Sequence, residues 1–282
     1  MPKQIKRMIL AFCFLLSAAP PDTLPYDLNN PSFLIYLVSE ELKEISGMSP
    51  TDTAGIYLAI ADERGEIFFV DGNGGGTILR KVLFRDKGDF EGVEMVGKCL
   101  YAAKSNGDIF EIGCWDSTSP KVTQYKTPLK KEDDVEGLCY DPYRFALLVA
   151  CKQNPDSAGL RRVFAFDLKS KQLAPDPVYT IDPEVVNSMV PLEKSDKHTR
   201  FSPSGIAIHP ITKDIYITST ALKRLVVLDY QSGKVKYAVR LDKKLLPQPE
   251  GIAFDQEGNL LLSSEGKKGE GLIFKFDYRT GK

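Results

Sequence analysis

The sequence predicts an all-β protein, a five-bladed β-propeller whose last blade is closed by an N-terminal strand. The main observation is a Glu-Gly or Ser-Gly step that opens a short apolar strand, as in Val135-Glu136-Gly137-Leu138. The step recurs at intervals of 45, 45, 68 and 46 residues, and a period of this size filled with short strands is typical of propeller blades. The glycines that anchor the repeat are Gly47, Gly92, Gly137, Gly205 and Gly251.

Within each repeat, runs of β-branched, aromatic and other apolar residues predict four short strands separated by turn residues. In the second repeat we expect strands at 92–96, 99–103, 108–112 and 121–127. The first repeat predicts strands at 47–48, 55–61, 66–70 and 78–84, and the last predicts only three, at 251–254, 259–263 and 271–276. The apolar segment 33–38 lies before the first glycine about where 78–84 lies before the second. We therefore expect this segment to be the outer strand of the last blade, which leaves that blade without an unpaired edge.

One interval is irregular, because 23 more residues separate Gly137 from Gly205 than separate the other glycines. Most of the surplus falls at about 173–200, a segment with four prolines and a candidate short helix at 184–189. We expect a loop inserted outside the blade, on one face of the propeller. The alternative is a degenerate sixth blade, although 23 residues are too few for four strands and their turns.

The N-terminal segment indicates an exported protein. Lys3, Lys6 and Arg7 precede an apolar run at 8–16 and then Ser17-Ala18-Ala19, which predicts a secretory signal peptide at 1–19, with an uncleaved N-terminal anchor as the alternative. The propeller would then occupy 20–282 and lie outside the cytoplasm, being periplasmic, secreted or attached to a membrane only through the N-terminal segment. The net charge of −1, without a long block of one sign, argues against nucleic acid as a partner.

Four cysteines follow the predicted signal: Cys99, Cys114, Cys139 and Cys151. A two-residue hairpin turn at 105–108 would place Cys99 opposite Cys114, where the geometry permits a disulfide in an oxidising compartment. Free thiols remain the alternative for this pair. For Cys139 and Cys151 the sequence gives no register, and we expect buried free thiols.

The residues before the five glycines carry the chemistry. In a propeller the inner strands line the central channel, so these residues meet at one of its mouths, as do the tips between the second and third strands of each blade. The first group is Ser46, Glu91, Glu136, Ser204 and Glu250, and the tips supply Asp62, Glu63, Ser105, Lys152, Ser219, Thr220, Ser264 and Glu265.

Carboxylates that share one axis raise one another's pKa unless a cation or a donor stabilises them. Ca²⁺ takes six to eight oxygen ligands and suits this set, whereas zinc and copper prefer His or Cys. The alternative is that each glutamate accepts a backbone N–H from the neighbouring blade and that water fills the channel.

The motifs around these positions resemble the SdiA-regulated family of exported or membrane-attached bacterial propellers, which is distantly similar to NHL-repeat proteins. The resemblance spans about residues 26–282 and implies a five-bladed propeller with a calcium site and no established reaction. In the family's acidic motif positions this sequence has Glu44, Glu91, Glu136 and Glu250. The segments that carry the resemblance are Leu42-Lys43-Glu44-Ile45-Ser46-Gly47, Ala61-Asp62-Glu63, Asp89-Phe90-Glu91-Gly92, Asp134-Val135-Glu136-Gly137, Ser202-Pro203-Ser204-Gly205-Ile206 and Leu246-Pro247-Gln248-Pro249-Glu250-Gly251-Ile252.

A more distant similarity is to gluconolactonase-type propellers, in which a glutamate before a glycine binds a catalytic divalent metal. Glu91, Glu136 and Glu250 each fit that single position, and Asp62 is the one tip residue that fits the general base, but the further Asn of that pattern is not found. Our interpretation is therefore an exported calcium-binding scaffold that presents its rim to a small ligand or a protein. The metal candidates are Glu44, Asp62, Glu63, Glu91, Glu136 and Glu250. The alternatives are a metal-dependent lactonase or esterase with Asp62 as base, and a structural module without metal.

Overall fold

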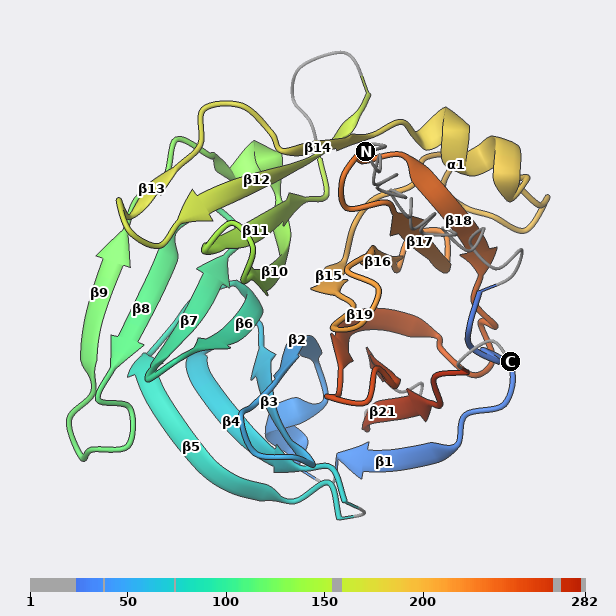
Figure 1. Cartoon of the computed structure of the whole chain (residues 1–282). Helices are drawn as coiled ribbons and strands as arrows, with labels where there is room; N and C mark the ends of the chain where they lie inside the picture. The colour runs from blue at the N-terminus through green and yellow to red at the C-terminus, as the bar shows by residue number, and fades with distance from the viewer. Residues whose placement is uncertain (1–23, 38, 74, 154–158, 266–269, 280–282) are drawn as a thin grey trace, which may run out of the picture.

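The computed structural model describes residues 24–37, 39–73, 75–153, 159–265 and 270–279, and these residues form five antiparallel sheets arranged around a central axis (Figure 1). The predicted five-bladed propeller is thereby confirmed. The first blade is β2 (Ile45–Pro50), β3 (Ile56–Ala61), β4 (Gly65–Asp71) and β5 (Ile78–Arg85), and the second is β6 (Phe90–Val96), β7 (Cys99–Lys104), β8 (Ile109–Gly113) and β9 (Lys121–Tyr125).

The third blade is β10 (Val135–Asp141), β11 (Ala146–Cys151) and β12 (Arg161–Asp167), with an outer strand in two pieces, β13 (Gln172–Leu173) and β14 (Tyr179–Ile181). The fourth is β15 (Gly205–Ile208), β16 (Ile215–Ser219), β17 (Arg224–Leu228) and β18 (Val235–Arg240). The fifth is β19 (Gln248–Phe254), β20 (Leu260–Glu265), β21 (Gly271–Phe276) and β1 (Phe33–Leu37). Three short helices connect strands: η1 (Glu40–Leu42), η2 (Lys131–Asp133) and α1 (Pro183–Met189).

The N-terminal strand closes the ring as predicted. β1 runs antiparallel to β21, with Phe33 opposite Lys275 and Leu37 opposite Gly271 (Figure 1). Its side chains alternate: Ile35 and Leu37 are buried, whereas Tyr36 is 54% exposed. Residue 38, the last of the predicted strand, lies outside the described residues.

Apolar side chains hold the blades together by packing between neighbouring sheets. One cluster joins Ile35 and Leu37 of the closing strand with Leu261 of β20 and with Met48 and Phe68 of the first blade. Comparable clusters fill the spaces between the other blades. Burial of this apolar surface is the main driving force for assembling the ring.

The Glu-Gly step corresponds to a β-bulge where an inner strand begins. The register between inner and second strand shifts across Ser46, Glu91 and Glu136, and also between Pro249 and Ile252. A bulge residue has no partner in the ladder, so its side chain can be redirected, here to the channel mouth.

The glycine that follows is required by close approach between inner strands. A Cβ on Gly92 would lie 2.5 Å from Cβ of Leu138 in the next blade, and a Cβ on Gly205 would lie 2.3 Å from the carbonyl oxygen of Glu250. Neither glycine has a positive φ, so the space at the axis, and not the backbone conformation, selects glycine here.

The predicted register of the second-blade hairpin is wrong by one residue. The turn holds three residues, because Lys104 N–H donates to the Asp108 carbonyl at 3.0 Å and Gly107 adopts a left-handed φ of 88°. Cys99 therefore faces Gly113 and not Cys114, which follows β8 and is exposed. All four described cysteines are free, and Cys139 and Cys151 are buried.

The segment predicted as an insertion, 173–200, divides into two parts. Its first part includes β14, which pairs with β12 and belongs to the third blade. Its second part begins with α1 and includes the helix predicted at 184–189. The excess length thus serves partly to interrupt the outer strand and partly to carry the chain across to the fourth blade. We call residues 182–200 the insertion from here on.

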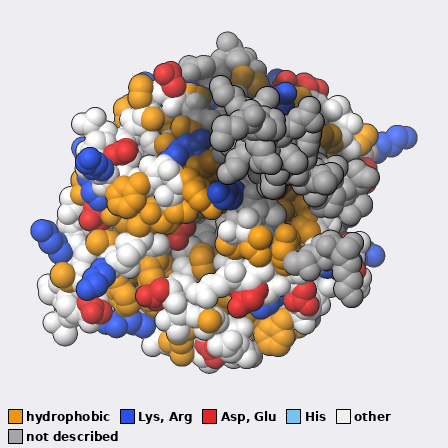
Figure 2. All heavy atoms as spheres, in the orientation of Figure 1, with side chains coloured by type: hydrophobic (Ala, Val, Ile, Leu, Met, Phe, Trp, Pro, Cys, Tyr) orange, Lys and Arg blue, Asp and Glu red, His pale blue; other side chains and the backbone are white. Residues whose placement is uncertain are grey.

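The predicted signal peptide or anchor at 1–19 lies outside the described residues. In the described part of the chain, no helix combines the length and the hydrophobicity needed to cross a membrane. Figure 2 shows one face of the ring, and among the described side chains visible there the basic and acidic groups are interspersed.

Candidate functional site

The residues before the five glycines meet at one end of the channel, which we call the acidic mouth. The two serines act there as structural links between blades. Ser46 Oγ donates to the Phe90 carbonyl at 2.8 Å, and Ser204 Oγ donates to the Pro249 carbonyl at 2.8 Å. Both serines are buried, and their hydroxyl groups are used in these bonds. The three glutamates are therefore the residues of this set that can bind a cation at the mouth.

Glu91, Glu136 and Glu250 influence one another electrostatically across the mouth. Burial, followed by the charge of Glu136, raises the pKa of Glu91 to about 9. The same two causes, in the same order, raise the pKa of Glu250 to about 8. Burial also raises the pKa of Glu136 to about 7, although a lysine ammonium opposes this shift. The folded protein therefore holds three carboxyl groups in a place that disfavours their ionised forms.

Lys152, at the tip between β11 and β12, supplies a positive charge to this group. Its ammonium lies 2.7 Å from Oε1 of Glu136 and 3.8 Å from Oδ2 of Asp134. Burial lowers the pKa of Lys152, but the charge of Glu136, the hydrogen bond to it and the charges of Asp134 and Glu250 together outweigh burial, so the pKa is raised overall. The position of Lys152 in a tip predicts that it lies at this mouth. The sequence does not predict the ion pair between Lys152 and Glu136.

A second acidic group lies on the rim, at the first and fifth blades. Burial and then the charge of Glu44 raise the pKa of Asp62, and burial followed by Glu44 and Asp62 raises that of Glu265. Asp62 Oδ1 is buried without a hydrogen-bond partner, whereas Glu44 and Glu63 are exposed. These three acids line a cavity of about 290 Å³. The six predicted metal candidates thus divide into a central set of three and a rim set of three.

The donor chemistry of the acidic mouth fits a hard cation, since carboxylate oxygens are the ligands that Ca²⁺ prefers. In the described ranges, however, no three His, Cys, Asp or Glu side chains stand close enough together to hold a metal ion. Cation binding by these residues would therefore require rotation of side chains toward a common point.

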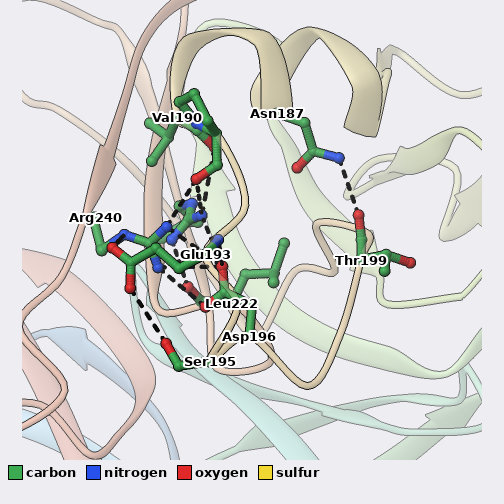
Figure 3. Close-up of polar contacts among 10 residues, drawn as sticks. Asn187, Val190, Glu193, Ser195, Asp196, Thr199, Leu222 and Arg240 are labelled. Atoms are coloured by element: carbon green, nitrogen blue, oxygen red, sulfur yellow. Dashed lines mark hydrogen bonds and ion pairs between the residues drawn. The ribbon is translucent and has the colours of Figure 1, made fainter.

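The insertion is fixed to the fourth blade by two arginines (Figure 3). Arg240 pairs with Asp196 at 3.1 Å and with Glu193 at 3.1 Å, and donates to the Pro191 carbonyl at 2.9 Å. Arg224 is fully buried and donates to the Leu222 carbonyl at 2.8 Å, with Asp196 at 3.5 Å.

A cavity of about 740 Å³ lies between this insertion and the tips of the fourth blade. Its lining includes Thr220, whose hydroxyl donates to the Pro249 carbonyl beside Glu250. It also includes Lys223, whose pKa is lowered by burial against the opposing charges of Glu250 and Glu265. The acidic mouth therefore adjoins a hollow walled by the insertion.

The channel is closed just behind the glutamates. A void of only about 10 Å³ remains between the inner strands, lined by the repeat glycines and by Met48, Leu138, Ile206 and Ile252. The acidic mouth is consequently a shallow site, separated from the opposite end of the channel.

Comparison with known proteins places the chain among propellers. The model of the SdiA-regulated family matches residues 35–268. Among solved structures, Myxococcus xanthus glutaminyl cyclase superposes with a TM-score of 0.57 at 12% identity, covering 90% of this chain and 97% of that one. A nidogen/laminin complex gives 0.49 at 16% identity, covering 78% and 72%, and Staphylococcus aureus virginiamycin B lyase gives 0.47 at 15% identity, covering 82% and 65%. At these identities the likeness concerns the fold alone. No curated protein matches in sequence.

Proposed function

Because this chain belongs to the SdiA-regulated family, we propose that it is an exported propeller that binds Ca²⁺ at its acidic mouth and presents that mouth to a small ligand or a partner protein. The pattern at 1–19 supports the extracytoplasmic location, and the hollow between the mouth and the insertion supports the role as a scaffold.

The observation that carries the proposal is the central set of glutamates. Burial raises the pKa values of Glu91, Glu136 and Glu250, and the charge of Glu136 raises those of Glu91 and Glu250 further. Among the described residues the ammonium of Lys152 is the one cation bonded to any of them. A divalent cation would supply the charge that three carboxylates lack, and would favour their ionised forms. When bound, Ca²⁺ would order the rim; Glu91, Glu136 and Glu250 are the residues that would hold it.

Metal-dependent hydrolysis of lactones or esters is the second candidate. It is favoured by Asp62, whose Oδ1 is buried without a hydrogen-bond partner and whose pKa is raised by burial and by Glu44. Such a carboxylate is suited to accept a proton from water.

A calcium titration followed by thermal melting tests the proposal. An ion that binds only the folded state adds about 2.7 kcal/mol at a hundredfold excess over its dissociation constant, so the melting temperature should rise with Ca²⁺ and fall with a chelator. The rise should shrink in Glu136→Gln. It should persist in Glu257→Gln, which removes an exposed carboxylate from a turn at the other end of the channel.

A melting temperature indifferent to both Ca²⁺ and chelator would contradict the calcium site. The same preparations, incubated with a panel of lactones and aryl esters, separate the two candidates. Turnover that requires metal and disappears in Asp62→Asn, with the calcium effect on melting retained, would establish the hydrolase in place of the scaffold.

A further inference from the structure

The largest feature not yet used lies where the inner strands end, at the mouth opposite the glutamates. A cavity of about 490 Å³ opens there and receives lining residues from all five blades. We call it the apolar cavity. Met48, Leu138, Ile206 and Ile252 line both this cavity and the small void behind it, so they form its floor. Its volume lies within the range of about 300–1,000 Å³ that is usual for sites binding small organic molecules.

A single buried carboxylate, that of Glu94, lines this otherwise largely apolar space. Glu94 is 7% exposed and lies on β6. Its Oε1 accepts the N–H of Met95 at 2.9 Å, and its Oε2 accepts the N–H of Tyr140 in the next blade at 2.8 Å. Each carboxylate oxygen can accept a further hydrogen bond. The two backbone bonds fix the group in place and leave it able to receive a ligand.

The charges around the cavity favour a cation. Besides Glu94 the lining contains the carboxylate of Asp52, and it contains no lysine or arginine. His209 also lines the cavity, but burial lowers its pKa to about 4, so its ring is neutral near pH 7. No lysine or arginine charge contributes to the pKa shift of Glu94, whose causes are burial, the two backbone bonds and the Ser49 hydroxyl.

At the rim, the Tyr143 ring is 49% exposed, and the ammonium of Lys213 already lies 4.4 Å from its centroid. Aromatic faces favour both apolar and cationic groups. Buried charges in proteins are generally paired, and Glu94 stands out because it is not. The unpaired carboxylate and the apolar floor therefore indicate a ligand with one cationic group and an apolar body.

We propose that the apolar cavity binds a small, largely apolar molecule that carries one protonated amine, with the ammonium donating to Glu94 and the apolar body covering the floor. Burial raises the pKa of Glu94 to about 7, and a bound ammonium would stabilise its ionised form. The site is independent of the acidic mouth, because the closed channel separates the two.

Two fluorescent probes of nearly equal size test this proposal. Monodansylcadaverine has an apolar dansyl group and a terminal ammonium, and its N-acetyl derivative has the same body without the charge. The folded wild-type protein should bind the ammonium probe about tenfold more tightly, as expected for a charge-assisted hydrogen bond. Equal affinity for the two probes, or no binding of either, would overturn the proposal.

Three variants locate the binding. Glu94→Gln should abolish the preference for the charged probe. Because this change also disturbs two backbone bonds, Ile208→Trp provides a second route: Ile208 is half-buried at the end of β15, and the larger ring would fill the cavity. Binding of both probes should then fall by at least about tenfold. Glu136→Gln, at the other mouth, should leave both affinities unchanged. Undiminished binding to Ile208→Trp would place the probe elsewhere and contradict the proposal.

Discussion

At the scale of single residues, side chains at the ends of three inner strands accept backbone N–H groups of the turn that follows. Asp141 Oδ1 accepts the backbone N–H groups of residues 143 and 144 at 2.9 and 3.1 Å. Asp255 Oδ1 accepts that of residue 259 at 2.8 Å. In the fourth blade His209 takes this place, and its Nδ1 accepts the N–H groups of residues 211 and 212 at 3.1 and 3.0 Å. Since Nδ1 is an acceptor, protonating His209 breaks the turn.

His209 should therefore make the stability of the fold depend on pH. Its pKa of about 4 in the folded state lies below the ordinary value of 6.5, so the unfolded chain binds the proton more tightly. The stabilisation is complete above pH 6.5 and is lost as the pH falls toward 4, by up to about 1.4 kcal/mol per pH unit. Urea denaturation at a series of pH values measures this slope.

The matched variants are His209→Asn, which keeps an acceptor but cannot be protonated, and His198→Asn, which alters an exposed histidine of the insertion. His209→Asn should remove the contribution of His209 to the slope between pH 6.5 and 4, and His198→Asn should leave the slope as in the wild type. A wild-type slope that survives in His209→Asn would assign the pH dependence to other groups.

At the scale of the element, the inner strand begins with a bulge and a glycine, and the two have separate causes. The bulge releases a side chain from the ladder, and the glycine allows the next blade to approach. A methyl group at Gly92 would meet both Cβ and the backbone nitrogen of Leu138, at 2.5 and 2.9 Å. Backbone cannot move aside as a flexible side chain can.

Gly92→Ala should accordingly lower the free energy of unfolding by about 1–3 kcal/mol, the usual cost of overpacking. Gly113→Ala in the same blade is the control, since a Cβ there would meet only the Lys121 carbonyl, at 3.9 Å. Chemical denaturation of both variants measures the difference. Similar losses in the two would mean that the inner strands can separate to admit a side chain.

The same elements show what the sequence could and could not reveal. The four-strand repeat and the positions of Glu91, Glu136 and Glu250 could be predicted, because each depends on local alternation and on a step that recurs along the chain. The hairpin register was wrong because Gly107 takes a left-handed conformation that adds a residue to the turn. The apolar cavity was missed because its lining comes from five inner strands and the turns after them, and each strand alone has the pattern of an ordinary core strand.

At the scale of the whole molecule, the ring depends on one strand supplied from the far end of the chain. Ile35 is 2% exposed and packs between the fifth and first blades, whereas Tyr36 on the same strand faces outward. Ile35 should therefore stabilise the contact that closes the ring, whereas Tyr36 should contribute little to it.

Ile35→Ala should cost about 2–5 kcal/mol, as large-to-small substitutions in a core do. Tyr36→Ala should change the free energy of unfolding by no more than about 0.5 kcal/mol, as is usual for surface substitutions. Urea denaturation followed by circular dichroism compares them. If Ile35→Ala proves as stable as the wild type, the closing strand does not secure the ring.

The origin of the closing strand also sets the order of events during synthesis. Phe33 is synthesised more than two hundred residues before its partner Lys275. The first four blades can each complete their own hydrogen bonding by Arg240, whereas β1 must wait, apolar and unpaired, until the last strand appears. Contacts between such distant residues form slowly, and an apolar strand left waiting is prone to pair with other chains. In a nascent chain that stops short of β21, β1 would stay unpaired and exposed. Holdases and proteases that bind exposed apolar segments could therefore recognise the incomplete chain.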